Sequence, residues 1–231
     1  MKGKLLLLPN LLDESLSHEL YLPAGLQGVV STLKGLICES EKGGRRFLRR
    51  FLSHDQMAAL PLQLLNEHTT SLEPLLAPLL KGEGWGLISD AGLPCIADPG
   101  SDLVRLAHEK GISVETFAGP SSILMSLQLS GFSGQQFSFH GYLPREAADL
   151  EAKLLELERR TKEGTQIWIE APYRSAKMLE MLLRALKEET RLCLAVNLTM
   201  PSQRVLTAAV AKWRAHPFPL AKEPAVFLIG R

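Results

Sequence analysis

The sequence has few cysteines, and none of them stands in a Cys-x-x-Cys pair. Cys38, Cys95 and Cys193 are the three cysteines of the 231-residue chain, and an odd number of thiols cannot all pair with one another. This pattern favours free thiols in a reducing compartment over a disulfide framework. We therefore expect a cytoplasmic protein.

Long apolar runs are also missing. No stretch approaches the roughly 20 apolar residues that a helix needs to cross a bilayer, so we expect no membrane partner. The apolar start at residues 2–12 is interrupted by Pro9 and Asn10, and no small-residue cleavage site follows it. These features argue against a secretory signal peptide.

Neither sign of charge is in excess. The 26 lysines and arginines nearly balance the 25 acidic residues, so no global field attracts a polyanion, and any contact with nucleic acid must use a local patch. The clearest patch lies at residues 42–50, where Arg45 and Arg49, and likewise Arg46 and Arg50, are four positions apart on a predicted helix. Both phosphate contact and a solvated basic face fit this pattern.

Short apolar runs alternate with longer segments of helical period. The runs are continuous, as expected of strands that are covered on both faces. Ser101, Ser121 and Ser175 are placed to begin three of the helices, and Gly111 and Gly131 to end the first two. The alternation predicts an α/β fold with mostly parallel sheets and right-handed crossovers. The predicted strands are 4–8, 36–38, 85–88, 112–117, 137–140, 166–169, 192–196 and 225–229.

A Gly-Pro pair near the midpoint is the clearest candidate for a domain boundary. Gly119 and Pro120 interrupt the chain at a position where neither helix nor strand periodicity continues. The length suits one large α/β domain or two small ones. We expect two α/β domains, at residues 1–118 and 119–231.

The residues that follow the predicted strands are the most informative. Ligands of open α/β sheets bind beyond the carboxyl ends of the strands. Residues 89–100 contain two aspartates, two glycines and two prolines, more than a strand-to-helix connection of about 2–6 residues needs. The small residues Ala91, Gly92 and Ala97 would leave a flat slot for an aromatic base. The alternative is a rigid structural loop that caps a helix through Asp98 or Ser101.

Residues 88–100, Ile-Ser-Asp-Ala-Gly-x-Pro-x-Ile-x-Asp-Pro-Gly, resemble the signature of the tetrapyrrole methylase superfamily. They are most similar to its branch that 2′-O-methylates a cytidine of small-subunit ribosomal RNA. Three further motifs match that branch in order and spacing: Gly-Pro-Ser at 119–121, Gly-Tyr-Leu-Pro at 141–144 and Glu-Ala-Pro-x-Arg at 170–174. The resemblance runs from about Glu39 to the C-terminus. It implies two α/β domains with S-adenosylmethionine in the cleft between them, a homodimer, and a metal-free SN2 transfer of the methyl group.

The resemblance also carries the family's methyl-donor contacts onto positions of this chain. They are Asp90, Ala91, Gly92, Cys95, Ile96, Ala97, Ser121 and Ser122, with Pro9, Ala171 and Asn197 matched less closely. At Cys95 we expect backbone contacts to the donor rather than a nucleophilic thiol.

Two segments depart from the family's pattern. The first loop normally carries glycines after the first strand, whereas residues 8–13 are Leu-Pro-Asn-Leu-Leu-Asp and keep only the proline. The branch's Glu-Asp-x-Arg is Glu-Ser-Glu-Lys at 39–42, and its Pro-His-Arg is Pro-Tyr-Arg at 172–174. The substituted positions lie where the acceptor is expected, so the sequence supports the donor better than the acceptor.

A hydroxyl acceptor needs a base or a charge-stabilising neighbour. Glu39, Asp98 and Glu170 are the candidates for that role, and Arg174 is the candidate for orienting a phosphate or carboxylate. A carboxylate at the end of a strand can equally cap a helix or pair with an arginine. Both interpretations fit each of the three acids.

The histidines give little support to metal or base chemistry. His54 and the Asn-Glu-His-Thr segment at 66–69 lack HExxH spacing, so we expect no metal, and His140 fits a structural role better than that of a base. The sequence predicts an S-adenosylmethionine-dependent methyltransferase that acts on ribosomal RNA or the small ribosomal subunit. The alternatives are a methyltransferase for a tetrapyrrole or other small molecule, and a non-catalytic module that binds the donor.

Overall fold

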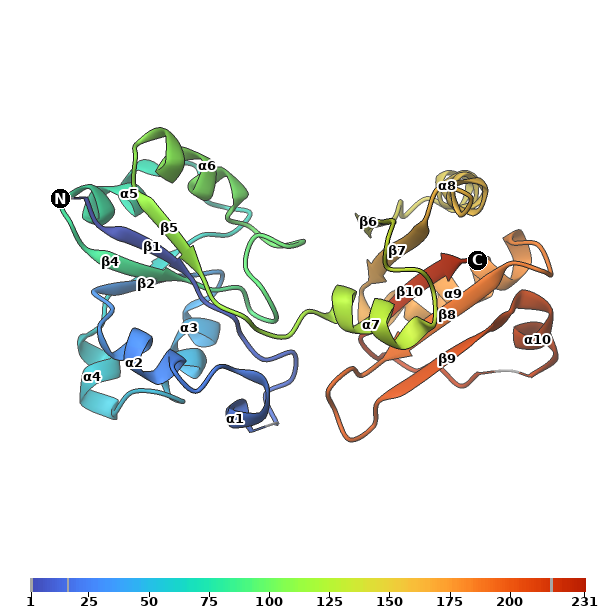
Figure 1. Ribbon diagram of the computed structural model, residues 1–231, viewed down its shortest axis with the longest axis horizontal. Helices are drawn as coiled ribbons and strands as arrows, with labels where there is room; N and C mark the ends of the chain where they lie inside the picture. The colour runs from blue at the N-terminus through green and yellow to red at the C-terminus, as the bar shows by residue number, and fades with distance from the viewer. Residues whose placement is uncertain (1, 16, 217) are drawn as a thin grey trace. The chain divides into compact units, whose positions relative to one another are not determined.

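Figure 1 shows a computed structural model of the protein, which describes residues 2–15, 17–216 and 218–231. The chain divides into two compact units, Met1–Ser121 and Ser122–Arg231. We expected the boundary between residues 118 and 119, directly before the Gly-Pro pair. The observed division lies after Ser121, one residue beyond that pair. No helix in the described residues has the length and apolar character needed to cross a membrane.

The first unit is built on a parallel sheet, sheet A, with the strand order β3-β2-β4-β1-β5. The three central strands are largely buried, with Leu5 and Ile37 fully shielded from solvent, which explains their apolar sequences, whereas the two outer strands are half-exposed. The strands are β1 (Lys4–Leu7), β2 (Gly35–Cys38), β3 (Leu62–Leu64), β4 (Gly84–Leu87) and β5 (Ser113–Thr116).

Helices cover both faces of sheet A (Figure 1). One hydrophobic cluster joins the sheet to α2 and α3, and a second joins its other face to α5 and α6. The helices are α1 (His18–Tyr21), α2 (Leu26–Ser31), α3 (Glu41–Leu48), α4 (His54–Ala59), α5 (Glu73–Leu80) and α6 (Ser101–Glu109). The N-cap of α6 is Gly100, and Ser101 is already the first helical residue.

The second unit contains sheet B, with the strand order β6-β7-β10-β8-β9. Its strands are β6 (Phe137–Tyr142), β7 (Thr165–Glu170), β8 (Arg191–Val196), β9 (Arg204–Ala209) and β10 (Ala225–Gly230). Only β6 and β7 pair in parallel, while β7–β10, β10–β8 and β8–β9 are antiparallel. The expectation of mostly parallel strands therefore holds for sheet A and is wrong for sheet B. The connection from β8 to β9 is too short for a parallel crossover.

The helices of the second unit are α7 (Ser122–Ser130), α8 (Ala147–Arg160), α9 (Ser175–Ala185) and α10 (Val210–Ala215), with a 3₁₀ turn at Pro172–Arg174. A hydrophobic cluster joins α8, α9 and α10 to one face of sheet B and includes Leu192 and Leu194. Helix α7 packs against the opposite face, where the Thr207 hydroxyl donates to the Ser130 carbonyl at 2.8 Å. The predicted helix ends at Gly111 and Gly131 both have positive φ, 64° and 72°.

Candidate functional site

The carboxyl edge of sheet A gathers most of the predicted site residues. Because its strands are all parallel, the segments that follow β1, β2, β4 and β5 meet at this edge. Pro9 follows β1, Glu39 follows β2 and residues 89–100 follow β4. After β5, Gly119 packs so tightly on Pro9 that an added Cβ would lie 2.0 Å from the Pro9 Cβ. The structure thus brings together the motifs at 89–100 and 119–121 and the first loop.

The loop at 89–100 has an unusual backbone. Gly92 and Gly100 have φ of 72° and 135°, and Cys95 and Ala97 have φ of 68° and 67° although they carry side chains. A left-handed conformation costs a residue with a side chain about 1–2 kcal/mol. Such strain persists only where the surroundings enforce it, and it gathers at functional sites. The loop is therefore more than a connection between β4 and α6.

Asn10 holds this loop in place. Its buried side-chain amide donates to the carbonyls of Ser89 and Asp90, both at 3.0 Å, and its backbone N–H donates to the Gly92 carbonyl at 2.8 Å. The Asn10 Oδ1 accepts from Nη1 of Arg50 at 2.9 Å. The sequence analysis did not identify Asn10 as a site residue. Asn10 stands in the loop after the first strand, where the family that the chain resembles normally has glycines. A polar amide side chain directly after a buried strand was the signal that could have identified it.

The carboxyl groups of Glu39, Asp90 and Asp98 meet at the same edge of sheet A. The Asp90 backbone N–H donates to Oε1 of Glu39 at 2.9 Å, and the Ser40 hydroxyl donates to Oδ1 of Asp90 at 3.2 Å. Gly43, in the first turn of α3, leaves room for the Asp90 carboxylate, since an added Cβ would lie 2.1 Å from its Oδ1.

Burial and repulsion from neighbouring carboxylates raise the pKa values of Asp98 and Glu39. Burial and then the charge of Glu39 raise the pKa of Asp98 to about 6, against a lowering by a hydrogen bond from Ser89. Burial also raises the pKa of Glu39. The pKa of the Cys95 thiol rises to about 11 through burial and the charge of Asp98, so Cys95 stays protonated at neutral pH. The backbone contacts expected at Cys95 stay a prediction.

The other predicted residues lie in the second unit, at one edge of sheet B. Both β7 and β8 are antiparallel to β10, so they run in the same direction, and Ala171 and Asn197 follow them at the same edge. The Asn197 amide donates to Oε1 of Glu223 at 2.7 Å and to the Ser202 hydroxyl at 3.1 Å, and its φ is 52°. Ser122 is the first residue of α7.

Glu170 and Arg174 form a buried ion pair. Oε2 of Glu170 lies 3.1 Å from Nη2 of Arg174, and the two side chains are 1% and 18% exposed. Oε1 of Glu170 accepts from the Ala171 N–H at 2.8 Å, and Arg174 also donates to the Pro144 carbonyl at 3.2 Å. The pair therefore ties the 170–174 motif to the 141–144 motif, which matches the ion-pair interpretation of Glu170. Its catalytic role stays a prediction.

The basic segment at 42–50 is largely neutralised by neighbouring acids. Glu14 pairs with Arg46 at 3.0 Å and also with Arg50. Arg45 pairs with Glu41 at 3.6 Å, and of the four arginines only Arg49 has no ion pair within the described residues. Phosphate contact by the whole set is not favoured by this arrangement.

The histidines behave as structural or exposed residues. His140 Nε2 is 2.8 Å from Oε1 of Gln166, and burial lowers its pKa. His54 is exposed beside Asp55. Within the described residues, no group of three His, Cys, Asp or Glu side chains is arranged to hold a metal ion.

Comparisons with known proteins relate the chain to methyltransferases. A sequence model of the family described as Tetrapyrrole (Corrin/Porphyrin) Methylases matches residues 24–212. The chain is 33% identical to "Ribosomal RNA small subunit methyltransferase I" of Xylella fastidiosa over 76% of this chain and 63% of that protein. For the protein of the same name from Vibrio cholerae the figures are 33%, 67% and 54%, and for that from Leptospira biflexa 32%, 84% and 79%. The chain thus spans between about half and two thirds of the first two relatives.

Solved structures share the fold at low sequence identity. The structure of the methyltransferase CobJ aligns with a TM-score of 0.65 and 14% identity, over 100% of this chain and 95% of that one. The uroporphyrin-III-C-methyltransferase from Thermus thermophilus aligns with a TM-score of 0.56 and 16% identity, over 99% and 94%. With the family model covering most of its length, this chain belongs to the tetrapyrrole methylase family.

Proposed function

We propose that the protein is an S-adenosylmethionine-dependent methyltransferase that 2′-O-methylates ribosomal RNA. Family membership supports the reaction class, and the names of the curated relatives support the acceptor. The observation that carries the proposal is the strained loop at 89–100, which contains Asp98 and is held in place by Asn10.

The carboxyl edge of sheet A suits a flat, positively charged ligand. A Cβ added at Gly92 would approach Cδ2 of Leu12 to 3.3 Å and the Pro120 carbonyl oxygen to 3.6 Å, so a side chain at this position would crowd the loop. Glu39, Asp90 and Asp98 create a local negative potential there. When bound, S-adenosylmethionine supplies a methyl group on a positively charged sulfur, which this potential attracts.

The residues of the chain then orient the reactants and accept a proton. Asn10 and the left-handed residues fix the loop before the ligand binds, so little ordering is left for the reaction step. As the acceptor oxygen bonds to the methyl carbon and the carbon–sulfur bond breaks, the Asp98 carboxylate takes the hydroxyl proton. A pKa of about 6 leaves Asp98 mostly ionised at neutral pH yet more basic than an ordinary carboxylate.

The remaining predicted residues complete the proposal. Ser121, Ser122, Ala171 and Asn197 supply further donor contacts. Arg174 orients a phosphate of the acceptor, because among the described bonds only its Nη2 is used, in the pair with Glu170 and the bond to Pro144. The protein works in the cytoplasm as a homodimer. Its cysteines, all free, agree with a reducing compartment.

Transfer of a labelled methyl group tests the proposal. We expect the protein to label RNA in small ribosomal subunits taken from cells that lack it, and an Asp98→Asn variant to bind the donor without labelling RNA. A methylated 2′-oxygen cannot attack the adjacent phosphate, so the label should be found in an alkali-resistant dinucleotide. Label in a tetrapyrrole, or tight donor binding with no labelled product, would contradict the proposal and favour one of the two alternatives.

A further inference from the structure

A surface pocket of about 560 Å³ lies in the second unit, away from the motif residues of that unit. It is lined by the end of α8, by the segment before β8 and by the first residue of β8, Arg191, next to Gly230 at the end of β10. Glu170 and Asn197 lie at the opposite ends of the strands of sheet B, at or just after the last residues of β7 and β8. A six-residue strand rises about 3.3 Å per residue, so roughly 16 Å separate the pocket end of the strands from the motif end.

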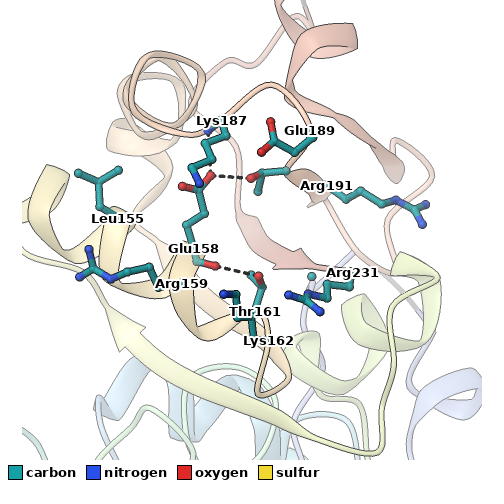
Figure 2. Close-up of a pocket in the computed structure, with 11 residues that line it drawn as sticks. Leu155, Glu158, Arg159, Thr161, Lys162, Lys187, Glu189, Arg191 and Arg231 are labelled. Carbon is teal, nitrogen blue, oxygen red and sulfur yellow. Dashed lines mark hydrogen bonds between the residues drawn. The ribbon is translucent and has the colours of Figure 1, made fainter.

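Basic side chains dominate the lining (Figure 2). The charged residues are Arg159, Lys162, Lys187, Arg191 and Arg231, with the acids Glu158 and Glu189. The Glu158 carboxylate accepts hydrogen bonds from the backbone N–H of Lys187 and the hydroxyl of Thr190, so it is committed to holding the segment before β8. The pocket therefore presents a surplus of positive charge.

These cations have no ion-pair partners within the described residues. Arg159, Lys162 and Lys187 are exposed and form no salt bridge there, whereas the neighbouring Arg160 pairs with Glu156 and Glu163. Gathering unpaired like charges is unfavourable, and an anion in the pocket would relieve the repulsion. The arrangement resembles a binding surface more than a solvated face laced with ion pairs.

The shape of the charged surface favours an extended anion. Figure 2 shows Arg159 and Arg191 directed outward on opposite sides of Glu158, with Lys187 and Lys162 between them. The Arg191 guanidinium lies over the Phe132 ring, 5.7 Å from its centroid. No aromatic side chain lines the pocket among the described residues, so bases have nothing to stack on. The lining can hold phosphates, and it offers little to read a base sequence.

We propose that this pocket binds the phosphodiester backbone of RNA at nucleotides that flank the methylated one. The proposal rests on the proposed function, because it assumes an RNA acceptor. A contact roughly 16 Å from the motif edge of the same sheet cannot take part in methyl transfer. It adds affinity without sequence preference.

Removal of the charges tests the pocket. We would compare a variant carrying Arg159→Gln, Lys162→Gln and Lys187→Gln with a control carrying Lys81→Gln, Lys110→Gln and Lys212→Gln. All six side chains are exposed, so both variants should fold, and both lose the same charge. Thermal unfolding and donor affinity by calorimetry should match the unaltered protein in each case.

The expected readout is the salt dependence of binding to a single-stranded RNA of random sequence. Each lost phosphate contact should reduce the slope of log K against log salt concentration by about 0.7, or about 2 for the pocket variant. Its affinity at low salt should fall about 10- to 100-fold, while the control changes little. In transfer assays, KM for RNA should rise by a similar factor and kcat should stay unchanged.

The outcomes separate this proposal from the proposed function. If the pocket variant and the control have the same salt slope while the unaltered protein binds and methylates RNA, the pocket proposal is wrong and the function stands. If the slope falls as expected but RNA is never methylated, the pocket binds RNA and the proposed reaction is wrong. If the unaltered protein does not bind RNA at all, both are overturned.

Discussion

Asp98 combines burial with two carboxylate neighbours, and its raised pKa sets a pH dependence for the reaction. With a pKa of about 6 in the free enzyme, the fraction of Asp98 able to accept a proton falls as the pH drops through 6. We expect kcat/KM to fall tenfold per pH unit below that point. A profile of kcat/KM from pH 5 to 8 checks this, and a flat profile would remove Asp98 as the base.

The raised pKa of Asp98 should also lower the free energy of unfolding at neutral pH. Because the pKa of Asp98 is raised from 3.8 to about 6 on folding, the folded state holds its proton more tightly than the unfolded state. Its contribution to stability is greatest below pH 4 and is lost as the pH rises through 6. Asp98→Asn should therefore increase the free energy of unfolding at pH 7.5 by about 1 kcal/mol, allowing for partial solvent exposure.

Denaturant titration measures that change, and the transfer assay should show a drop in kcat of about 100-fold or more in the same variant. At pH 3 the stability gain should nearly vanish, since Asp98 is then protonated in both the folded and the unfolded state. A loss of stability at pH 7.5 would mean that the carboxylate is a structural partner and not a strained functional group.

Asn10 is expected to act as a positioning residue. Asn10→Ala leaves the Ser89 and Asp90 carbonyls without their donor, which should cost about 1–3 kcal/mol in unfolding free energy. The donor affinity should fall because the loop loses its support. Asn10→Asp keeps the acceptor for Arg50 but cannot donate, so it should weaken donor binding in calorimetry as well. Unchanged affinity in both variants would contradict the role.

At the scale of elements, the loop between β4 and α6 can be tested through Gly92. Gly92→Val places a branched side chain against Leu12 and the Pro120 carbonyl and should weaken donor binding about 10- to 100-fold. Gly131→Val is the matched control, because Gly131 has the same φ of 72° and nothing within 4 Å of an added Cβ. Both variants should lose about 1–2 kcal/mol of stability from backbone strain, but only the first should lose affinity in calorimetry.

Helix α3 and the residues after it separate a structural arginine from a surface one. The Arg50 side chain is 11% exposed and bonded to Glu14 and Asn10, whereas Arg49 is exposed. Arg50→Gln should lower the free energy of unfolding by about 1.5–3 kcal/mol, and Arg49→Gln should change it by less than about 0.5 kcal/mol. Thermal denaturation of the two variants compares them directly. Equal changes in unfolding free energy for the two variants would mean that Arg50, like Arg49, belongs to a solvated basic face.

Elements with a clear apolar pattern could be predicted from the sequence, and those without one could not. The expected strands are all present, with ends that differ by one or two residues. Strands β3 and β9 were not predicted: β3 is a three-residue edge strand, and β9 is an edge strand that begins with Arg204 and whose apolar run is interrupted by Thr207. Strand direction in sheet B was mispredicted, because the sequence contains no local signal for the insertion of β10 between β7 and β8.

At the scale of the whole molecule, the sequence identified the fold class, the family and the edge of sheet A that carries the motifs. The concentration of small and acidic residues at 89–100 marked the loop that lies at this edge, while the roles of its residues stay predictions. It could not show that Asn10 supports the loop or that Glu14 neutralises Arg46 and Arg50, since these partners are 30 to 80 positions apart. Long-range polar contacts of this kind depend on packing.

Separate apolar interiors have a consequence for every measurement of stability. The clusters beneath α2, α3, α5 and α6 belong wholly to the first unit, and the cluster beneath α8, α9 and α10 wholly to the second. Each half can melt as its own cooperative block, so a single midpoint temperature would average two transitions. The damage from a substitution at Asn10 or Arg50 should then be visible in one calorimetric peak and leave the other where it was.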